Sequence, residues 1–340
     1  MTNHDGPGRD DTVTVVGIDE AGYGPLLGPL VVSAVAFDVP ACLFHRDAKG
    51  SPPDLWRLLR ASLSRRVNRR DPRLCVADSK VLFKPADGRG IVLLERAVLA
   101  FLSQTSQMPT TLGALIQMTC PDLGPLLADD PCRSGEELAL PVETSVADIR
   151  TQRNALRADL ESAGLRFRCV LSEVLPVGPF NERVEAARNK AVVLFALTTR
   201  LIERVARLTG ARRLSFWVDR QGGRMHYRSP LMSAFPDAHL EILAESAEFC
   251  GYRLSAPEMR RRVHFIKNGE SHHLPIALAS MTSKYLRELL MLGFNRFWSS
   301  HLPDLKPTGG YYEDGRRFLK DVGPMMARLK IDPRRVSRLL

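Results

Sequence analysis

Two adjacent carboxylates, Asp19 and Glu20, end an apolar and β-branched run near the start of the sequence. Three glycines follow at positions 22, 24 and 28, and a second apolar run begins at Leu30. This pattern predicts a β-hairpin with a glycine-rich loop. Adjacent side chains on a strand point to opposite faces, so both acids serve one site only where the strand twists or ends, as glycine permits. Unpaired charges after a buried strand are costly, which favours a metal or catalytic site over the alternative of acids that face water.

Further polar residues stand at the ends of three later predicted elements. The tripeptide Asp78-Ser79-Lys80 precedes a helix, although a simple Asp-Ser turn explains so short a motif equally well. Asp219 ends a short apolar strand, where it can also start a turn into the glycines that follow. Glu270 stands between a predicted strand and a long helical segment.

The run from Gly17 to Pro25, Gly-Ile-Asp-Glu-Ala-Gly-Tyr-Gly-Pro, resembles the opening motif of ribonuclease HII, the type 2 ribonuclease H family. Later motifs fall in the family's order over the blocks 12–104, 165–220 and 263–317, as in a divergent member with two insertions. The most specific of them is Ile276-Ala277-Leu278-Ala279-Ser280, with Lys284 and Arg287 downstream. The resemblance implies a ribonuclease H-like α/β fold, in which helices flank a mixed central sheet and the C-terminal portion is helical.

The resemblance also implies one catalytic site in which four acids hold Mg²⁺ or Mn²⁺, hard cations that suit carboxylate oxygens. These expected catalytic and metal-binding residues are Asp19, Glu20, Asp219 and Glu270. Two such cations activate water and stabilise charge on the leaving oxygen during phosphodiester hydrolysis. The implied activity is an endonuclease that hydrolyses the RNA strand of RNA/DNA hybrids, or ribonucleotides embedded in duplex DNA, and leaves a 3′-hydroxyl and a 5′-phosphate.

Substrate-binding residues are implied by the same resemblance. They are Gly22, Tyr23, Gly24, Lys80, Lys284, Tyr311 and Tyr312. The glycine backbone approaches the 2′-hydroxyl that distinguishes RNA, lysine contacts phosphate, and a tyrosine stacks on sugar or base. Packing of the last helices is the alternative role for the two tyrosines.

Three residues depart from the family pattern. Tyr23 stands where the family usually has Arg, Arg220 stands where Gly follows the third acid, and Glu270 replaces an Asp. We therefore expect an altered preference at RNA–DNA junctions, with hybrid cleavage retained where excision of a single ribonucleotide is not. Two alternatives stay open: a nucleic-acid-binding protein of the same fold without cleavage, and a metal-dependent nuclease that acts on structured DNA.

Composition narrows the class of protein. The 340-residue chain has a formal net charge of +10, which suits a polyanionic partner, although codon usage and solvated faces also explain arginine clusters. Six cysteines without a C-x-x-C pair argue against a zinc ribbon and a disulfide framework. Adjacent His272 and His273 suggest zinc, but the carboxylates favour Mg²⁺ or Mn²⁺. With no apolar run long enough to span a bilayer and no apolar signal segment, we expect a cytoplasmic monomer without a membrane partner.

The four expected catalytic acids can form one site only if helices and strands bring distant segments of the chain together. We expect a disordered N-terminus over 1–11, a catalytic domain over 12–300 and a substrate-side helical segment over 301–340. Insertions relative to the family cover about 105–164 and 232–262. Hydrophobic periodicity predicts helices over 54–67, 91–102, 146–163 and 189–208. Within the second insertion we expect an extended hairpin, with strands at 239–244 and 250–254.

Overall fold

The computed structural model of the chain describes residues 12–44, 51–68, 70–84, 90–124, 130, 137–257 and 259–339. The expected disordered N-terminus, residues 1–11, lies outside the described residues. Within the described ranges, no helix combines the length and the apolarity that crossing a membrane requires.

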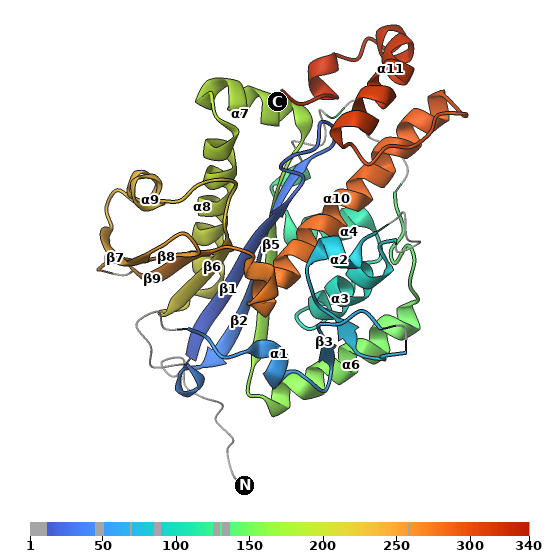
Figure 1. Ribbon diagram of the computed structural model, residues 1–340. Coiled ribbons are helices and arrows are strands. Elements are labelled where there is room, and N and C mark those ends of the chain that lie inside the picture. The colour runs from blue at the N-terminus through green and yellow to red at the C-terminus, as the bar shows by residue number, and fades with distance from the viewer. Residues whose placement is uncertain are drawn as a thin grey trace.

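A seven-stranded mixed sheet forms the centre of the molecule (Figure 1). Its strands, in spatial order, are β5 (Arg166–Leu175), β2 (Leu30–Pro40), β1 (Thr12–Ala21), β6 (Leu214–Asp219), β9 (Met259–Ile266), β8 (Phe249–Ala256) and β7 (His239–Glu245). β2 pairs antiparallel with both β1 and β5, whereas β6 pairs parallel with both β1 and β9. With helices on both faces, this arrangement confirms the expected α/β fold class, a mixed central sheet flanked by helices.

Helices cover both faces because successive residues of the central strands are apolar. Val15 packs in a core with α10 (Leu274–His301), α3 (Val92–Leu102) and α6 (Val146–Ser162). Its neighbour Val16 packs in a second core, on the other face, with α8 (Lys190–Thr209). The helices α7 (Val177–Ala187) and α9 (Arg228–Ala234) lie on the α8 side (Figure 1). α10 therefore crosses β1 and β2 on the face opposite α8.

The expected helical C-terminal portion is confirmed and has a small core of its own. It consists of α11 (Tyr312–Arg328) and the 3₁₀ turn η5 (Pro333–Arg335). Trp298 of α10 and Phe318 of α11 pack there with Leu26 and Leu27, which belong to the loop between β1 and β2. The C-terminal portion is thus fixed to the glycine-rich loop.

Three of the four predicted helices are confirmed as α3, α6 and α8, but the predicted helix over 54–67 is wrong. There, α1 covers only Leu55–Leu58, and the short strand β3 (Leu63–Ser64) pairs with β4 (Leu74–Cys75). The backbone N–H of Ser62 donates to Asp159 of α6 at 2.8 Å. Tertiary contacts of this kind override the helical spacing of the leucines.

The two stretches predicted as insertions pack on the main body. In the first, α4 (Leu112–Thr119) and α6 contribute Leu115 and Ile149 to the core beneath α10. In the second, β7 and β8 form the expected hairpin, which extends the central sheet beyond β9 (Figure 1).

Candidate active site

Asp19 and Glu20 lie near the carboxyl end of β1 and face opposite sides of the sheet. Gly17, two residues before Asp19, lies against the backbone of the first turn of α10, whereas Ile18, two residues before Glu20, packs in the core with α8. Asp19 is only 7% exposed, and its Oδ1 accepts a hydrogen bond from the backbone N–H of Glu20 at 2.7 Å. Ser280 of α10 also hydrogen-bonds to the Asp19 side chain.

Asp219 and Glu270 reach the same edge of the sheet from neighbouring elements. Asp219 is the last residue of β6, which runs parallel to β1 with Val218 opposite Ile18. Its Oδ1 accepts a hydrogen bond from the backbone N–H of Gly269 at 2.7 Å. Gly269 begins the 3₁₀ turn η4 (Gly269–Ser271), which joins β9 to α10 and contains the buried Glu270. Glu270 Oε2 has no hydrogen-bond partner among the described residues.

Asp19, Glu20 and Asp219 each have a raised pKa, and the charges of neighbouring acids contribute to each of these shifts. Burial, together with the charges of Glu20 and Asp219, raises the pKa of Asp19 well above its ordinary value. Burial and the charge of Asp219 raise the pKa of Glu20 to about 8. Burial and the charge of Glu270 raise the pKa of Asp219 to about 7. Carboxylates that oppose one another's ionisation form a site that a bound cation would stabilise.

The chemistry of these side chains fits a hard divalent cation. Every group is a carboxylate, and the buried Glu270 Oε2 is an acceptor with no donor among the described residues. The described part of the chain contains no group of three His, Cys, Asp or Glu side chains already in ligand geometry.

Of the adjacent residues His272 and His273, His273 packs against the central sheet. The His273 ring lies 4.2 Å from that of Trp217, centroid to centroid. Burial, with the nearby His272, lowers the pKa of His273 to about 4. His273 is therefore a neutral side chain that packs on β6 beside the acids.

Lys80 is exposed and lies beside the acids, in the short helix α2 (Ser79–Leu82). Asp78 caps this helix, since its Oδ1 accepts a hydrogen bond from the backbone N–H of Lys80 at 2.9 Å. Burial acts to lower the pKa of Lys80, but the charges of Asp78 and of three of the site acids outweigh it and raise the pKa. Lys80 thus places a cation at the edge of the acidic cluster.

The loop between β1 and β2 requires glycine where its backbone turns back. Gly22 has φ +85°, and a Cβ built on it would lie 2.5 Å from the carbonyl oxygen of Pro29. Gly28 has φ +83°, and a Cβ built on it would lie 2.3 Å from the sulfur atom of Met291 in α10. Gly24 is exposed, and no atom lies within 4 Å of the position that its Cβ would take. The open side of the loop is therefore at Gly24.

Tyr23 turns toward the α8 side of the sheet. Lys190 Nζ lies 5.0 Å from the centre of its ring. Burial and the charge of Glu20 raise the pKa of Tyr23, although Arg224 acts in the opposite direction. Tyr23 therefore lies next to Glu20 and between two basic side chains.

Lys284, a predicted substrate residue, is engaged within the protein. It is 8% exposed, and its Nζ forms an ion pair with Glu288 Oε1 at 2.7 Å. The same nitrogen lies 4.4 Å from the centre of the Phe83 ring. Lys284 is therefore a buried and neutralised cation, unlike Lys80.

Tyr311 and Tyr312 are both exposed, by 59% and 48%. The centre of the Tyr311 ring lies 6.0 Å from Nζ of Lys284, which belongs to α10. Tyr312 instead lies beside Arg316, at 5.7 Å. Tyr311 is thus the one of the two that adjoins another predicted substrate residue.

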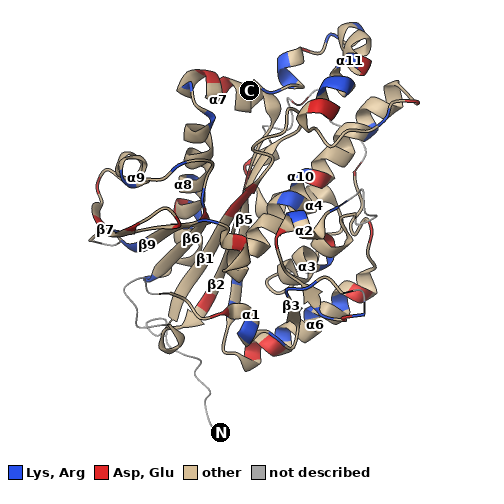
Figure 2. Cartoon of the chain, in the orientation of Figure 1, with Lys and Arg blue, Asp and Glu red and all other residues tan. Residues whose placement is uncertain are grey.

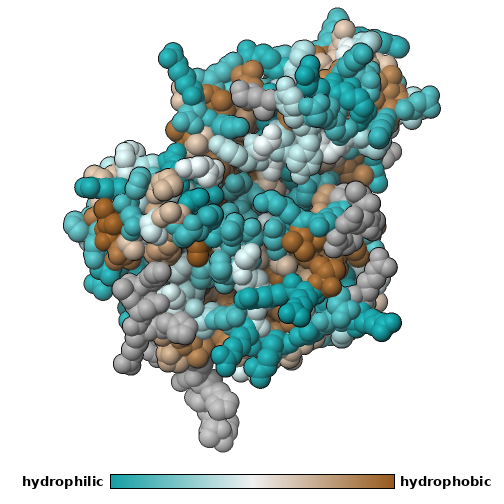
Figure 3. Space-filling model, in the orientation of Figure 1, coloured by the Kyte–Doolittle hydropathy of each residue, from teal (hydrophilic) through white to brown (hydrophobic). Residues whose placement is uncertain are grey.

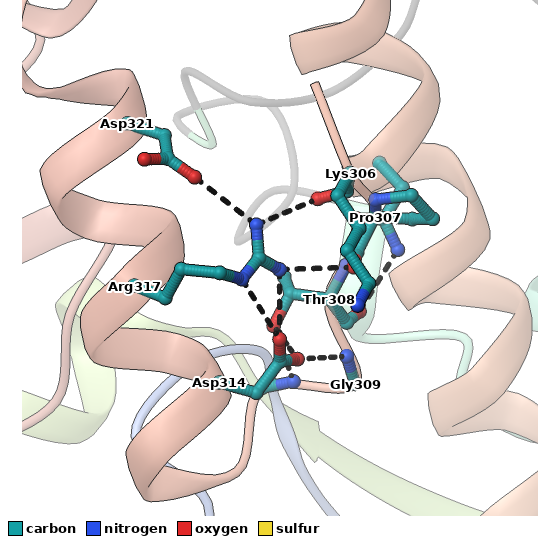
Figure 4. A network of polar contacts seen from close by, with 9 residues as sticks. Lys306, Pro307, Thr308, Gly309, Asp314, Arg317 and Asp321 are labelled. Atoms are coloured by element: carbon teal, nitrogen blue, oxygen red, sulfur yellow. Dashed lines mark hydrogen bonds and ion pairs between the residues drawn. The ribbon is translucent and has the colours of Figure 1, made fainter. Parts of the chain in front are cut away.

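The segment before these tyrosines is held by a polar network (Figure 4). Asp314 accepts hydrogen bonds from Thr308 Oγ1 at 2.6 Å and from the backbone N–H of Gly309 at 3.0 Å. Arg317 donates to the carbonyl oxygens of Lys306 and Pro307, at 3.2 and 3.1 Å. This network fixes the chain that leads into Tyr311.

A chain of buried serines behind Asp19 was not predicted. Ser283 of α10 donates to the carbonyl oxygen of Asp19 at 3.0 Å, and its Oγ lies 2.8 Å from that of Ser33. Ser33 Oγ lies 2.8 Å from that of Ser172 on β5. These three hydroxyls connect the backbone of Asp19 on β1 to β5 through β2. The available signal was Ser33 itself, a polar residue inside an apolar strand.

Figure 2 shows acidic residues on β1 and at the start of α10, in the middle of the view, with basic residues on the neighbouring helices. The same central area is mainly hydrophilic at the surface (Figure 3). The acidic edge of the sheet therefore lies in a polar region of this face.

The solved structures to which the chain is similar include ribonucleases H. The ribonuclease HII of Archaeoglobus fulgidus, in its complex with PCNA, is similar with a TM-score of 0.40 and 14% identity over 96% of this chain and 94% of that chain. The ribonuclease H2 of Pyrococcus horikoshii OT3 has a TM-score of 0.38 and 12% identity over 95% and 92%. Bst-RNase HIII in complex with Mn²⁺ has a TM-score of 0.39 and 14% identity over 96% and 66%. No protein-family model and no curated protein matches the chain.

Proposed function

We propose that the protein is a divalent-metal-dependent endonuclease that hydrolyses the RNA strand of RNA/DNA hybrids or ribonucleotides embedded in duplex DNA. The observation that carries this proposal is the gathering of Asp19, Glu20, Asp219 and Glu270 at one edge of the sheet, with Lys80 beside them. These acids come from separate parts of the sequence, on the neighbouring strands β1 and β6 and in the turn η4 that follows β9.

The four acids would hold Mg²⁺ or Mn²⁺. When bound, these cations supply an activated water and stabilise the charge that develops on the leaving oxygen. Hydrolysis joins the water oxygen to phosphorus and breaks the P–O3′ bond, and O3′ takes up a proton. The products carry a 3′-hydroxyl and a 5′-phosphate.

The other residues of the site would bind and orient the substrate. Lys80 contributes an exposed ammonium to a phosphate oxygen of the scissile strand. The open backbone at Gly24 allows close approach to a ribose 2′-hydroxyl, the group that distinguishes RNA from DNA. Tyr311 offers an exposed ring for stacking on sugar or base.

The test is cleavage of labelled duplexes with Mg²⁺ and with Mn²⁺, beside an Asp19→Asn control. The duplexes are a continuous RNA/DNA hybrid, a DNA duplex with one ribonucleotide, and an all-DNA duplex. We expect cleavage of the hybrid, weaker cleavage at the single ribonucleotide because Tyr23 replaces a fixed positive charge, no cleavage of DNA, and none by Asp19→Asn.

Two other outcomes would overturn the proposal. Tight binding of the hybrid without cleavage under either metal would identify a nucleic-acid-binding protein of this fold. Cleavage of a branched DNA in preference to the hybrid would identify a nuclease that acts on structured DNA.

A further inference from the structure

The side chain of Arg338 is buried and forms hydrogen bonds with the glycine-rich loop between β1 and β2. Arg338 is 4% exposed, and its Nε and Nη2 donate to the carbonyl oxygen of Gly28 at 2.9 and 2.6 Å. Its Nη1 donates to the carbonyl oxygen of Gly22. Its backbone N–H donates to the carbonyl oxygen of Leu26 at 2.9 Å. One residue thus holds three carbonyl groups of the loop that contains Tyr23 and Gly24.

The segment that carries Arg338 is itself anchored to α7. Asn181 is 1% exposed, and its Nδ2 donates to the carbonyl oxygens of Arg334 and Ser337 at 2.7 and 2.9 Å. Its Oδ1 accepts a hydrogen bond from the backbone N–H of Leu339 at 2.8 Å. The guanidinium of Arg338 therefore has a fixed position relative to the sheet.

The charge of Arg338 is not neutralised by an ion pair with any described residue. Its guanidinium lies 4.6 Å from the centre of the Phe180 ring and shares the loop with Arg287. Arg287 donates to the carbonyl oxygen of Leu27 at 3.2 Å and is itself paired with Glu288. A buried charge without an ion-pair partner among the described residues is costly, so its place against a candidate substrate loop suggests a functional use.

We propose that Arg338 is a positioning residue that shapes the loop from Gly22 to Gly28 for the sugar–phosphate backbone and supplies positive charge behind it. This inference rests on the proposed function and adds a determinant of substrate selection to it. Tyr23 leaves the loop without a cation of its own, and Arg338 places one against the carbonyl groups of Gly22 and Gly28. Because a planar guanidinium holds two carbonyl groups at once, lysine is not an equivalent replacement.

The experiment compares Arg338→Gln, Arg338→Lys and a control, Arg334→Gln. Arg334 lies in the same segment, but its side chain is exposed and paired with Glu185. Cleavage of the RNA/DNA hybrid gives kcat and KM for each variant. Binding of the hybrid and of all-DNA duplex at several salt concentrations is measured in the Asp19→Asn background, so that it does not depend on cleavage.

We expect Arg338→Gln to raise KM and to weaken hybrid binding about tenfold, to affect DNA binding less, and to reduce the salt dependence of hybrid binding. Arg338→Lys should retain the salt dependence and lose part of the preference for the hybrid, whereas Arg334→Gln should match the parent protein. A folded Arg338→Gln with unchanged KM and preference would overturn the proposal, as would equal weakening on both duplexes. If Arg338→Gln does not fold, an unchanged preference in Arg338→Lys overturns it. Absence of cleavage by the wild type would overturn the proposed function, while the binding arms would still test Arg338.

Discussion

At the scale of single residues, the ionisation of the candidate site depends on burial. Glu20 has its pKa raised from 4.5 to about 8, and Asp219 from 3.8 to about 7, because burial and neighbouring acids favour the protonated forms. An acid whose pKa is higher in the folded state binds its proton more tightly there. The stability it contributes is therefore present below the unfolded-state pKa and is lost as pH rises through the folded-state value.

We accordingly predict that the metal-free protein becomes less stable between about pH 5 and about pH 8.5, by at least about 1 kcal/mol. Urea unfolding in the presence of a chelator measures this change. The double variant Glu20→Gln, Asp219→Asn should show a flatter pH dependence, because it removes two of the titrating groups. An unchanged pH dependence in the double variant would mean that other groups are responsible.

At the scale of elements, the contact between α10 and β1 sets the distance between Ser280 and Asp19. A Cβ on Gly17 would lie 2.0 Å from the carbonyl carbon of Pro275, and no flexible side chain can yield there because the contact is with backbone. Gly17→Ala should therefore destabilise the protein by about 3 kcal/mol.

Gly24→Ala is the matched control, since nothing lies within 4 Å of its Cβ position. We expect it to change the free energy of unfolding by less than about 0.5 kcal/mol. Urea unfolding of the two variants gives the comparison. Equal stabilities would show that α10 does not approach β1 as closely as described.

A second link between elements joins the first predicted insertion to α10. Glu95 of α3 is fully buried and accepts four hydrogen bonds. The donors are the backbone N–H groups of Val142 (2.7 Å), Glu143 (2.8 Å) and Thr144 (2.9 Å) and the hydroxyl of Tyr285 (2.8 Å). This carboxylate fixes the chain around Val142 against the helix that carries Ser280 and Ser283.

Glu95→Gln should cost about 3 kcal/mol, because its amide nitrogen would face N–H donors instead of accepting from them. Hydrogen exchange at the amides of Val142, Glu143 and Thr144 should accelerate in the same variant. Glu161→Gln, at an exposed position of α6, serves as the control and should change neither quantity. Unaltered exchange at the three amides would contradict this role of Glu95.

At the scale of the whole molecule, local pattern predicted the elements but not their long-range connections. The helices α3, α6 and α8 followed from apolar periodicity, since burial imposes that spacing wherever such elements pack, whereas the mixed central sheet was expected from the family resemblance. The helix over 54–67 failed because Ser62 bonds to Asp159, nearly a hundred positions away in sequence, and spacing within one segment contains no information about such a partner.

In the candidate site, too, local sequence motifs were predictable and contacts between distant segments were not. The motif around Asp19 and Glu20 indicated a site at the carboxyl end of β1, near which Asp219 and Glu270 also lie. The catalytic roles of the four acids stay predictions. Arg338 and Glu95 were missed, because an arginine in a basic tail and a glutamate in a helix usually face water. Their roles follow only from burial and from contacts between distant segments.

The most direct test of the central claim is the rate of hybrid cleavage in Asp19→Asn, Glu20→Gln, Asp219→Asn and Glu270→Gln, beside the control Asp237→Asn at an exposed turn. If the four acids form one catalytic site, each variant should fold and lose more than about 100-fold in rate, with the control unchanged. Near-wild-type cleavage by two or more of the four variants would contradict the account.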